Sequence, residues 1–159
     1  MQQKIKFDLT TKGLSGVVML IPLTLLITHH FIIKDDVIIP DVVAIFLFIA
    51  FGITWMLHPT VYEITTEEFL IHRPKGPIRI KLNAIQSIEK TEPGMSIRLF
   101  GSGGLFGYFG LFSSKKLGKY YRYTGSNSNL VCITCTDKKY VVSIHEEEFY
   151  QHLLKVTTK

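Results

Sequence analysis

Residues 14–33 read LSGVVMLIPLTLLITHHFII and residues 37–57 read VIIPDVVAIFLFIAFGITWML, and these two runs decide the fold. The first contains no Asp, Glu, Lys or Arg, and the second contains a single charged residue, Asp41. About 20 residues at a helical rise of about 1.5 Å span the hydrocarbon core of a bilayer. The sequence therefore predicts a two-helix transmembrane hairpin over residues 13–58, preceded by an N-terminal tail at residues 1–12.

Two other interpretations of the first run are a buried core helix and a cleaved signal peptide. Soluble core helices rarely reach this length without a charge, and two in succession would dominate so short a chain. The run also lacks a small-residue cleavage pattern and leads directly into the second run. His29 and His30 fall where the first span should leave the hydrocarbon, and we expect both to be solvated rather than to bind a metal.

Composition and charge fit this hairpin. The 159 residues include 18 Lys and Arg and 13 Asp and Glu, for a net charge of +5, and 47% of them are hydrophobic. Two cysteines cannot make a disulfide framework, so a disulfide-rich secreted class is excluded. Basic residues flank both outer ends of the hairpin. By the positive-inside bias, we expect a multi-pass protein of the inner (cytoplasmic) membrane with both termini in the cytoplasm.

Residues 61–159 predict one β-rich domain that begins directly after the second span. Ile78–Leu82 alternates apolar and basic residues with the period of two that is typical of a half-buried strand. Ser143–Glu146 fits a helix capping box, and an apolar stripe follows it. The domain is thus expected to be a small barrel or sandwich closed by a C-terminal helix. Further strand candidates are residues 69–73, 85–89, 120–124, 130–136 and 140–144.

Several segments in this order resemble one family. They are the two apolar runs, Tyr62–Thr65, the strand pair through Leu82, the Gly-rich segment Arg98–Gly107, and the closing strand with its helix. Over nearly its whole length, the chain resembles the small membrane-tethered bacterial PH-domain proteins, which are pleckstrin-homology-like. The resemblance implies a mainly-β split barrel of about seven strands with a C-terminal α-helix. It does not imply a particular biochemical activity, because members of this family mostly have none assigned.

The most unusual stretch is a Gly/aromatic excursion at residues 98–119, where five glycines between Phe100 and Phe112 alternate with Phe and Tyr. It matches neither the dinucleotide fingerprint nor a P-loop. Two interpretations stay open. In the first, the aromatic side chains pack onto the barrel while the glycines permit tight turns. In the second, Phe106 and Phe109 are exposed and either enter the lipid interface or bind a partner.

Charge favours a binding surface in the same region. No acidic residue lies between Pro93 and Thr136, whereas five basic residues do, namely Arg98, Lys115, Lys116, Lys119 and Arg122. A cation near an anionic leaflet contributes about 1 kcal/mol. We expect these residues, with Phe106 and Phe109, to contact anionic lipid head groups or a protein partner, including a second copy of the chain. Nucleic acid is not expected as a partner of a membrane-bound domain.

Signals for catalysis are thin. Cys132 and Cys135 have the spacing of a redox or zinc pair, but residues three apart on a strand point to opposite faces, so we expect two ordinary strand cysteines. The histidines lack metal-type spacing to a carboxylate pair. The sequence therefore predicts a membrane-anchored binding or scaffold module with no catalysis, no cofactor and no metal. The alternative is a small membrane enzyme that handles a phosphate-bearing substrate at the Gly-rich loop.

Overall fold

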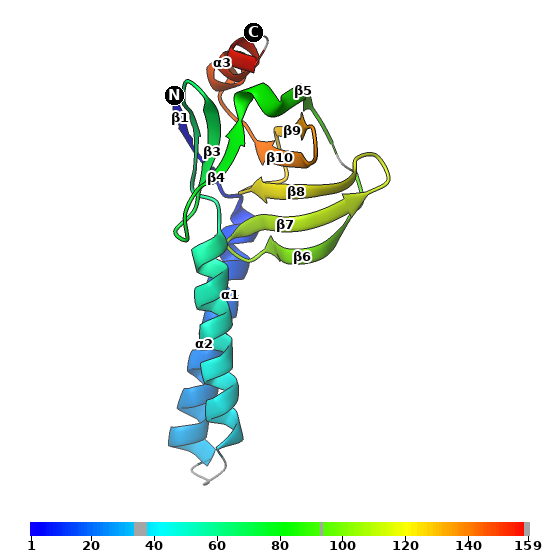
Figure 1. The fold of residues 1–159 in the computed structure, drawn as a ribbon. Helices are drawn as coiled ribbons and strands as arrows, with labels where there is room; N and C mark the ends of the chain where they lie inside the picture. Colours follow the sequence, from blue (N-terminus) through cyan, green and yellow to red (C-terminus); the bar gives the residue numbers. More distant parts are fainter. Residues whose placement is uncertain (34–37, 93, 158–159) are drawn as a thin grey trace.

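The computed structural model describes residues 1–33, 38–92 and 94–157, and shows a long helical hairpin attached to a β domain (Figure 1). Helix α1 (Leu9–Ile27) continues into a π-helical turn, η1 (Thr28–Ile33), and α2 (Ile39–Leu57) runs back beside α1. Both helices are long and apolar enough to cross a membrane, as predicted. The predicted connection at Lys34, Asp35 and Asp36 lies outside the described residues.

Local sequence explains where the two helices begin. The Asp8 carboxylate accepts a hydrogen bond from the Thr11 N–H at 2.7 Å and so caps α1. Pro40 occupies the first turn of α2, where a backbone N–H has no acceptor within the helix, so the lack of an N–H in proline costs no hydrogen bond. The prediction for the histidines at the hairpin end is half right. His30 has a side chain that is 60% exposed, but His29 is only 5% exposed because it packs against α2.

Two sheets form the β domain. One has the strand order β1-β2-β3-β4, and the other has the order β5-β9-β10-β8-β7-β6, with all pairs antiparallel except β10 and β8. The strands are β1 (Gln2–Lys4), β2 (Val61–Ile64), β3 (Glu68–His72), β4 (Ile78–Lys81), β5 (Ile85–Lys90), β6 (Ser96–Gly104), β7 (Gly107–Ser114), β8 (Gly118–Thr124), β9 (Leu130–Cys135) and β10 (Lys139–Ser143). A 3₁₀ turn, η2 (Leu82–Ala84), joins β4 to β5, and helix α3 (Glu147–Thr157) ends the described chain. The predicted β-rich domain with a C-terminal helix is confirmed.

The main core lies between the two sheets and α3. Tyr62 is fully buried and stacks on Phe69, which meets Phe149 of α3 edge-on. The Tyr62 hydroxyl donates to the Tyr123 carbonyl and accepts from the Ser143 N–H at 3.2 Å, so it links the two sheets. Burial raises the pKa of Tyr62 to about 12, and its phenol therefore stays protonated.

Ser143 does not cap α3, so the predicted capping box is wrong. Ser143 is the last residue of β10, and α3 begins only at Glu147. Its hydroxyl lies 3.4 Å from the Tyr62 hydroxyl instead. In the first turn of the helix, the Tyr150 N–H donates to the Glu146 carbonyl. Ser143 therefore contacts the buried Tyr62 instead of capping the helix, which is the role that the sequence pattern predicted.

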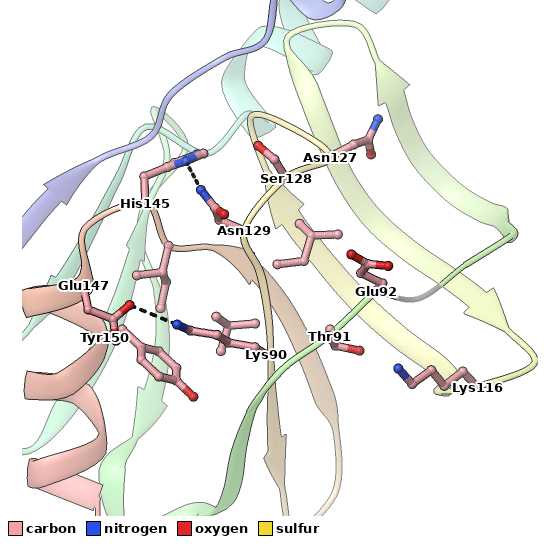
Figure 2. A pocket seen from close by; sticks show the side chains of 13 residues that line it. Lys90, Thr91, Glu92, Lys116, Asn127, Ser128, Asn129, His145, Glu147 and Tyr150 are labelled. Carbon is pink, nitrogen blue, oxygen red and sulfur yellow. Dashed lines mark hydrogen bonds and ion pairs between the residues drawn. The ribbon is translucent and has the colours of Figure 1, made fainter.

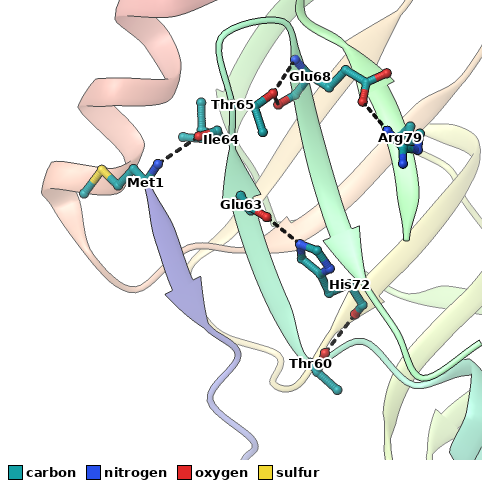
Figure 3. Close-up of polar contacts among 8 residues, drawn as sticks. All are labelled: Met1, Thr60, Glu63, Ile64, Thr65, Glu68, His72 and Arg79. Carbon is teal, nitrogen blue, oxygen red and sulfur yellow. Dashed lines mark hydrogen bonds and ion pairs between the residues drawn. The ribbon is translucent and has the colours of Figure 1, made fainter. Parts of the chain in front are cut away.

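The N-terminal residues complete the first sheet, which the sequence did not indicate. Strand β1 pairs antiparallel with β2, and Gln3 lies opposite Tyr62. The Met1 ammonium donates to the Ile64 carbonyl at 2.8 Å (Figure 3), and Ile5 is buried in the core. Across the same sheet, His72 bonds Glu63 at 2.7 Å (Figure 3). Residues 1–12, which we expected to be a tail, therefore include a strand of the β domain.

This pairing predicts that a soluble fragment beginning at Pro59 is unstable. It would lack β1 and Ile5 and would expose one edge of β2. A matched fragment that carries residues 1–8 joined to Pro59 by a short Gly/Ser linker should be more stable by roughly 3 kcal/mol, because it restores a buried Ile and the strand pairing. Urea unfolding followed by circular dichroism measures the difference. Equal midpoints for the two fragments would show that β1 contributes nothing to the fold.

Candidate binding surface

The Gly/aromatic segment forms a β-hairpin rather than an irregular excursion. Its strands β6 and β7 pair along their length, with Gly101 opposite Gly110. A Cβ on Gly101 would lie 2.0 Å from the Phe109 carbonyl oxygen, and a Cβ on Gly110 would lie 2.2 Å from that of Phe100. Both glycines also have positive φ. The two glycines are therefore required where the backbones approach closely.

The tip of this hairpin rests on the helical hairpin. The Phe106 N–H donates to the Ser15 hydroxyl of α1 at 2.8 Å, and the Phe106 and His58 rings lie 6.2 Å apart. A Cβ on Gly104 would lie 3.1 Å from the Leu14 side chain. Phe106 is therefore held against the ends of both helices, at the level where the charge-free run of α1 begins.

Two predicted site residues, Phe109 and Arg122, are buried. Phe109 is 4% exposed and Arg122 is 5% exposed. The Arg122 guanidinium lies 4.6 Å from the centre of the Tyr108 ring and donates to the Thr124 hydroxyl at 3.0 Å and to the Ser126 carbonyl at 3.2 Å. Burial lowers its pKa. Both side chains thus hold the sheet and the following loop, and neither lies on the accessible face that the sequence suggested.

The other four predicted basic residues are exposed and lie toward the opposite end of the hairpin from Phe106. Arg98 lies on β6, Lys115 and Lys116 lie in the turn between β7 and β8, and Lys119 lies on β8. The sequence therefore grouped residues that the structure divides into a docked tip, a buried middle and a basic far end.

Strand β6 carries three exposed apolar side chains, and a fourth directly precedes it; none of them was a predicted site residue. Met95, just before the strand, is 94% exposed, and Ile97, Leu99 and Phe100 are 67%, 49% and 74% exposed. This strand is an edge of the six-stranded sheet and is its nearest strand to the helical hairpin (Figure 1). A register shift between Arg98 and Phe100 marks a bulge. The run of apolar residues before the glycines was the available signal, but only the strand order shows that these side chains are uncovered.

Apolar and basic side chains meet at one open depression. The depression encloses about 700 Å³ and has one acidic residue in its lining, Glu92, beside Met95, Ile97, Lys115 and Lys116. The last four residues lie together in it. We call these four residues with Arg98, Leu99 and Phe100 the β6 surface. It combines exposed apolar area with positive charge, which is the composition that an anionic membrane interface attracts.

A second pocket, of about 720 Å³, is polar and of mixed charge (Figure 2). On one wall Lys90 pairs with Glu147 at 2.9 Å, and Lys116 lies on the opposite side (Figure 2). His145 accepts a hydrogen bond at Nδ1 from the Asn129 amide at 2.9 Å. Because each charge type is present, the pocket shows no preference for anions or cations.

The cysteines behave as predicted. Cys132 and Cys135 both lie on β9, and both are free thiols. Burial raises the pKa of each thiol, which opposes formation of the reactive thiolate. Cys132 lies in one apolar cluster of the domain and Cys135 packs against the other, as expected for strand residues that point to opposite faces.

His145 predicts a pH dependence of stability. Burial is the main cause that lowers its pKa, Lys6 adds to the lowering, and Glu146 opposes it. The unfolded chain, with a histidine pKa of about 6.5, then binds more protons than the folded chain just below that pH, so stability falls as the pH drops from about 7.5 to about 5.5. We expect His145→Gln to lose less stability over this range than the parent protein, as measured by thermal unfolding. His152→Gln, at an exposed position of α3, is the matched control, and an unchanged slope in His145→Gln would contradict the prediction.

Comparison with known proteins agrees with this architecture. The profile of the bacterial PH domain family matches residues 60–156, which includes nine of the ten strands and nearly all of α3. No curated protein and no solved structure matches the chain. The matched region covers more than half of the chain, and its sheets and closing helix form a PH-like fold. The chain therefore belongs to the bacterial PH domain family.

Proposed function

We propose that this protein is a membrane-anchored PH module that docks its β6 surface on the cytoplasmic face of the membrane and binds anionic lipid there. The family match supports a binding or scaffold module, and α1 and α2 support an anchor. The basic residues at both outer ends of the hairpin favour a cytoplasmic location for the β domain. The protein acts in this proposal by binding, without catalysis.

The observation that carries the proposal is the position of the β6 apolar side chains relative to the helices. Ser15, which holds the hairpin tip, is the second residue of the charge-free run that starts at Leu14. The tip therefore reaches the depth at which α1 enters the apolar phase. From that point β6 extends along the side of the domain nearest the helices (Figure 1), and the exposed side chains of Phe100 and Ile97 on this strand meet the membrane boundary in our proposal.

Charge supports lipid as the ligand. Lys115 and Lys116 line the same depression as Met95 and Ile97, and Arg98, which is also exposed, lines a neighbouring pocket with Tyr108 and Arg122. Three cations near an anionic surface contribute about 1 kcal/mol each at low salt. Apolar burial adds about 25 cal/mol for each Å² removed from water. Because the anchor already holds the domain at the surface, such modest energies are enough to set its docked population.

A protein partner, or a second copy that adds a strand to β6, is the competing occupant. Two features of the edge oppose strand addition. The bulge between Arg98 and Phe100 interrupts the regular row of backbone hydrogen-bonding groups along the edge. Arg98 places a charge next to this bulge. Both are devices that protect edge strands from pairing. The phosphate-handling enzyme is less favoured, because the Gly-rich segment is a paired hairpin and not an open loop.

A tryptophan reporter tests the docking. In a Trp55→Phe background, Phe100→Trp should be quenched by bromine-labelled anionic lipid in nanodiscs and should emit at shorter wavelength, because the ring enters the apolar interface. Gln151→Trp, at an exposed position on α3, is the matched control and should not be quenched. Equal and weak quenching of the two reporters would reject docking through β6.

The basic residues should make the docking depend on lipid charge. Adding Lys115→Gln and Lys116→Gln to the Phe100→Trp reporter removes up to about 2 kcal/mol of attraction and should lower the quenching in anionic nanodiscs at low salt. Lys138→Gln with Lys155→Gln removes the same charge elsewhere and should have little effect. If quenching is the same at every lipid charge and salt concentration and in both double variants, the surface contacts the bilayer but does not require anionic lipid.

A further inference from the structure

We propose that His29, His30 and Asp41 form a binding site for a divalent transition metal, best matched by Zn²⁺, at the end of the helical hairpin farthest from the β domain. The side-chain atoms of these three residues lie within 4.8 Å of one another. The site is separate from the β6 surface and does not depend on the lipid proposal.

The two histidines are adjacent residues of the π-helical turn η1. Their rings have a centroid separation of 5.1 Å. Such π-helical turns are rare, and they occur frequently at functional sites.

Asp41 completes the set from the neighbouring helix. It lies in the first turn of α2, and its Oδ1 atom is 3.1 Å from His29 Nδ1 and 3.3 Å from His30 Nε2. A tetrahedral Zn²⁺ with bonds of about 2.0–2.2 Å holds neighbouring ligand atoms about 3.4 Å apart. The observed separations between the carboxylate oxygen and each nitrogen are therefore close to the edges of such a site, and the two nitrogens lie within 4.8 Å of each other.

The donor set selects the class of ion. Two imidazoles and one carboxylate suit Zn²⁺, Ni²⁺ or Cu²⁺, whereas Mg²⁺ and Ca²⁺ prefer oxygen ligands. Three protein ligands leave a fourth position for water or an exchanging ligand. His30, with its side chain 60% exposed, lies on the accessible side, and His29 is buried. The ion has an entry path and can exchange.

The sequence context makes the cluster unusual for an apolar hairpin. Asp41 is the single charged residue of the second apolar run, and ionisable residues inside membrane segments are costly and usually functional. A bound cation would neutralise the carboxylate and join η1 to the first turn of α2. The same three residues would otherwise form a hydrogen-bonded ion pair, which is the outcome that the experiment must separate.

Metal titration of the purified full-length chain in detergent tests the proposal. After chelator treatment, we expect one equivalent of Zn²⁺ to bind in competition with a chromophoric chelator, and Co²⁺ to give the intense visible bands of a tetrahedral site. His30→Ala and Asp41→Asn should each weaken Zn²⁺ binding by more than about tenfold, which is about 1.4 kcal/mol. His152→Ala and His58→Ala remove histidines elsewhere and should leave the affinity unchanged.

Folding is controlled within the same series. His30 is exposed and Asp41→Asn preserves shape, so the helical circular dichroism spectrum of both variants should match that of the parent. No binding by the folded parent, or equal binding by the parent, His30→Ala and Asp41→Asn, would overturn the metal site and leave only an ion pair.

Discussion

The arrangement of the molecule depends on the attachment of the helical hairpin to the β domain at both of its ends. The Ile5 N–H donates to the Thr60 carbonyl at 3.0 Å, and the Asp8 N–H donates to the Gly125 carbonyl at 3.1 Å, directly before α1 begins. On the return, the Thr60 N–H donates to the His72 carbonyl at 2.9 Å. In the described part of the chain, α2 ends at Leu57 and β2 begins at Val61, so a short connection joins helix to sheet. These contacts keep the domain close to the helices and limit the range of positions that β6 can take.

Much of this fold could be predicted because the relevant patterns are local. Charge-free runs of helical length mark α1 and α2, and alternation marks strands such as β4. Strand β1 has no such pattern, since Gln2, Gln3 and Lys4 form a strand only because an edge of β2, far away in sequence, accepts them. Glycine is disfavoured in strands, so the β6–β7 hairpin was also missed; there the close approach of Gly101 and Gly110 outweighs propensity.

The binding surface was predicted only in part, because sequence proximity does not determine the side of a sheet on which a residue lies. Arg122 lies opposite Gly110 in the sheet, and its guanidinium lies over the Tyr108 ring. Arg122, which was predicted to be a surface cation, is therefore a buried residue that holds the sheet and the following loop together. Met95 and Ile97 are uncovered because β6 is an edge, a fact that follows from non-local strand order. Composition directed attention to this segment, but it could not show which of its side chains are accessible.

The pairing of β1 with β2 also has a consequence for how the protein is made. During synthesis β1 emerges first, and its partner emerges only after both helices have left the ribosome. In a membrane, the two strands can meet only if the chain between them crosses an even number of times. In a molecule whose α2 failed to insert, β1 and β2 would lie on opposite sides of the membrane. Tyr62 and Ile64 would then lie at an unpaired edge of the sheet. Pairing of β1 with β2 therefore requires that both helices insert.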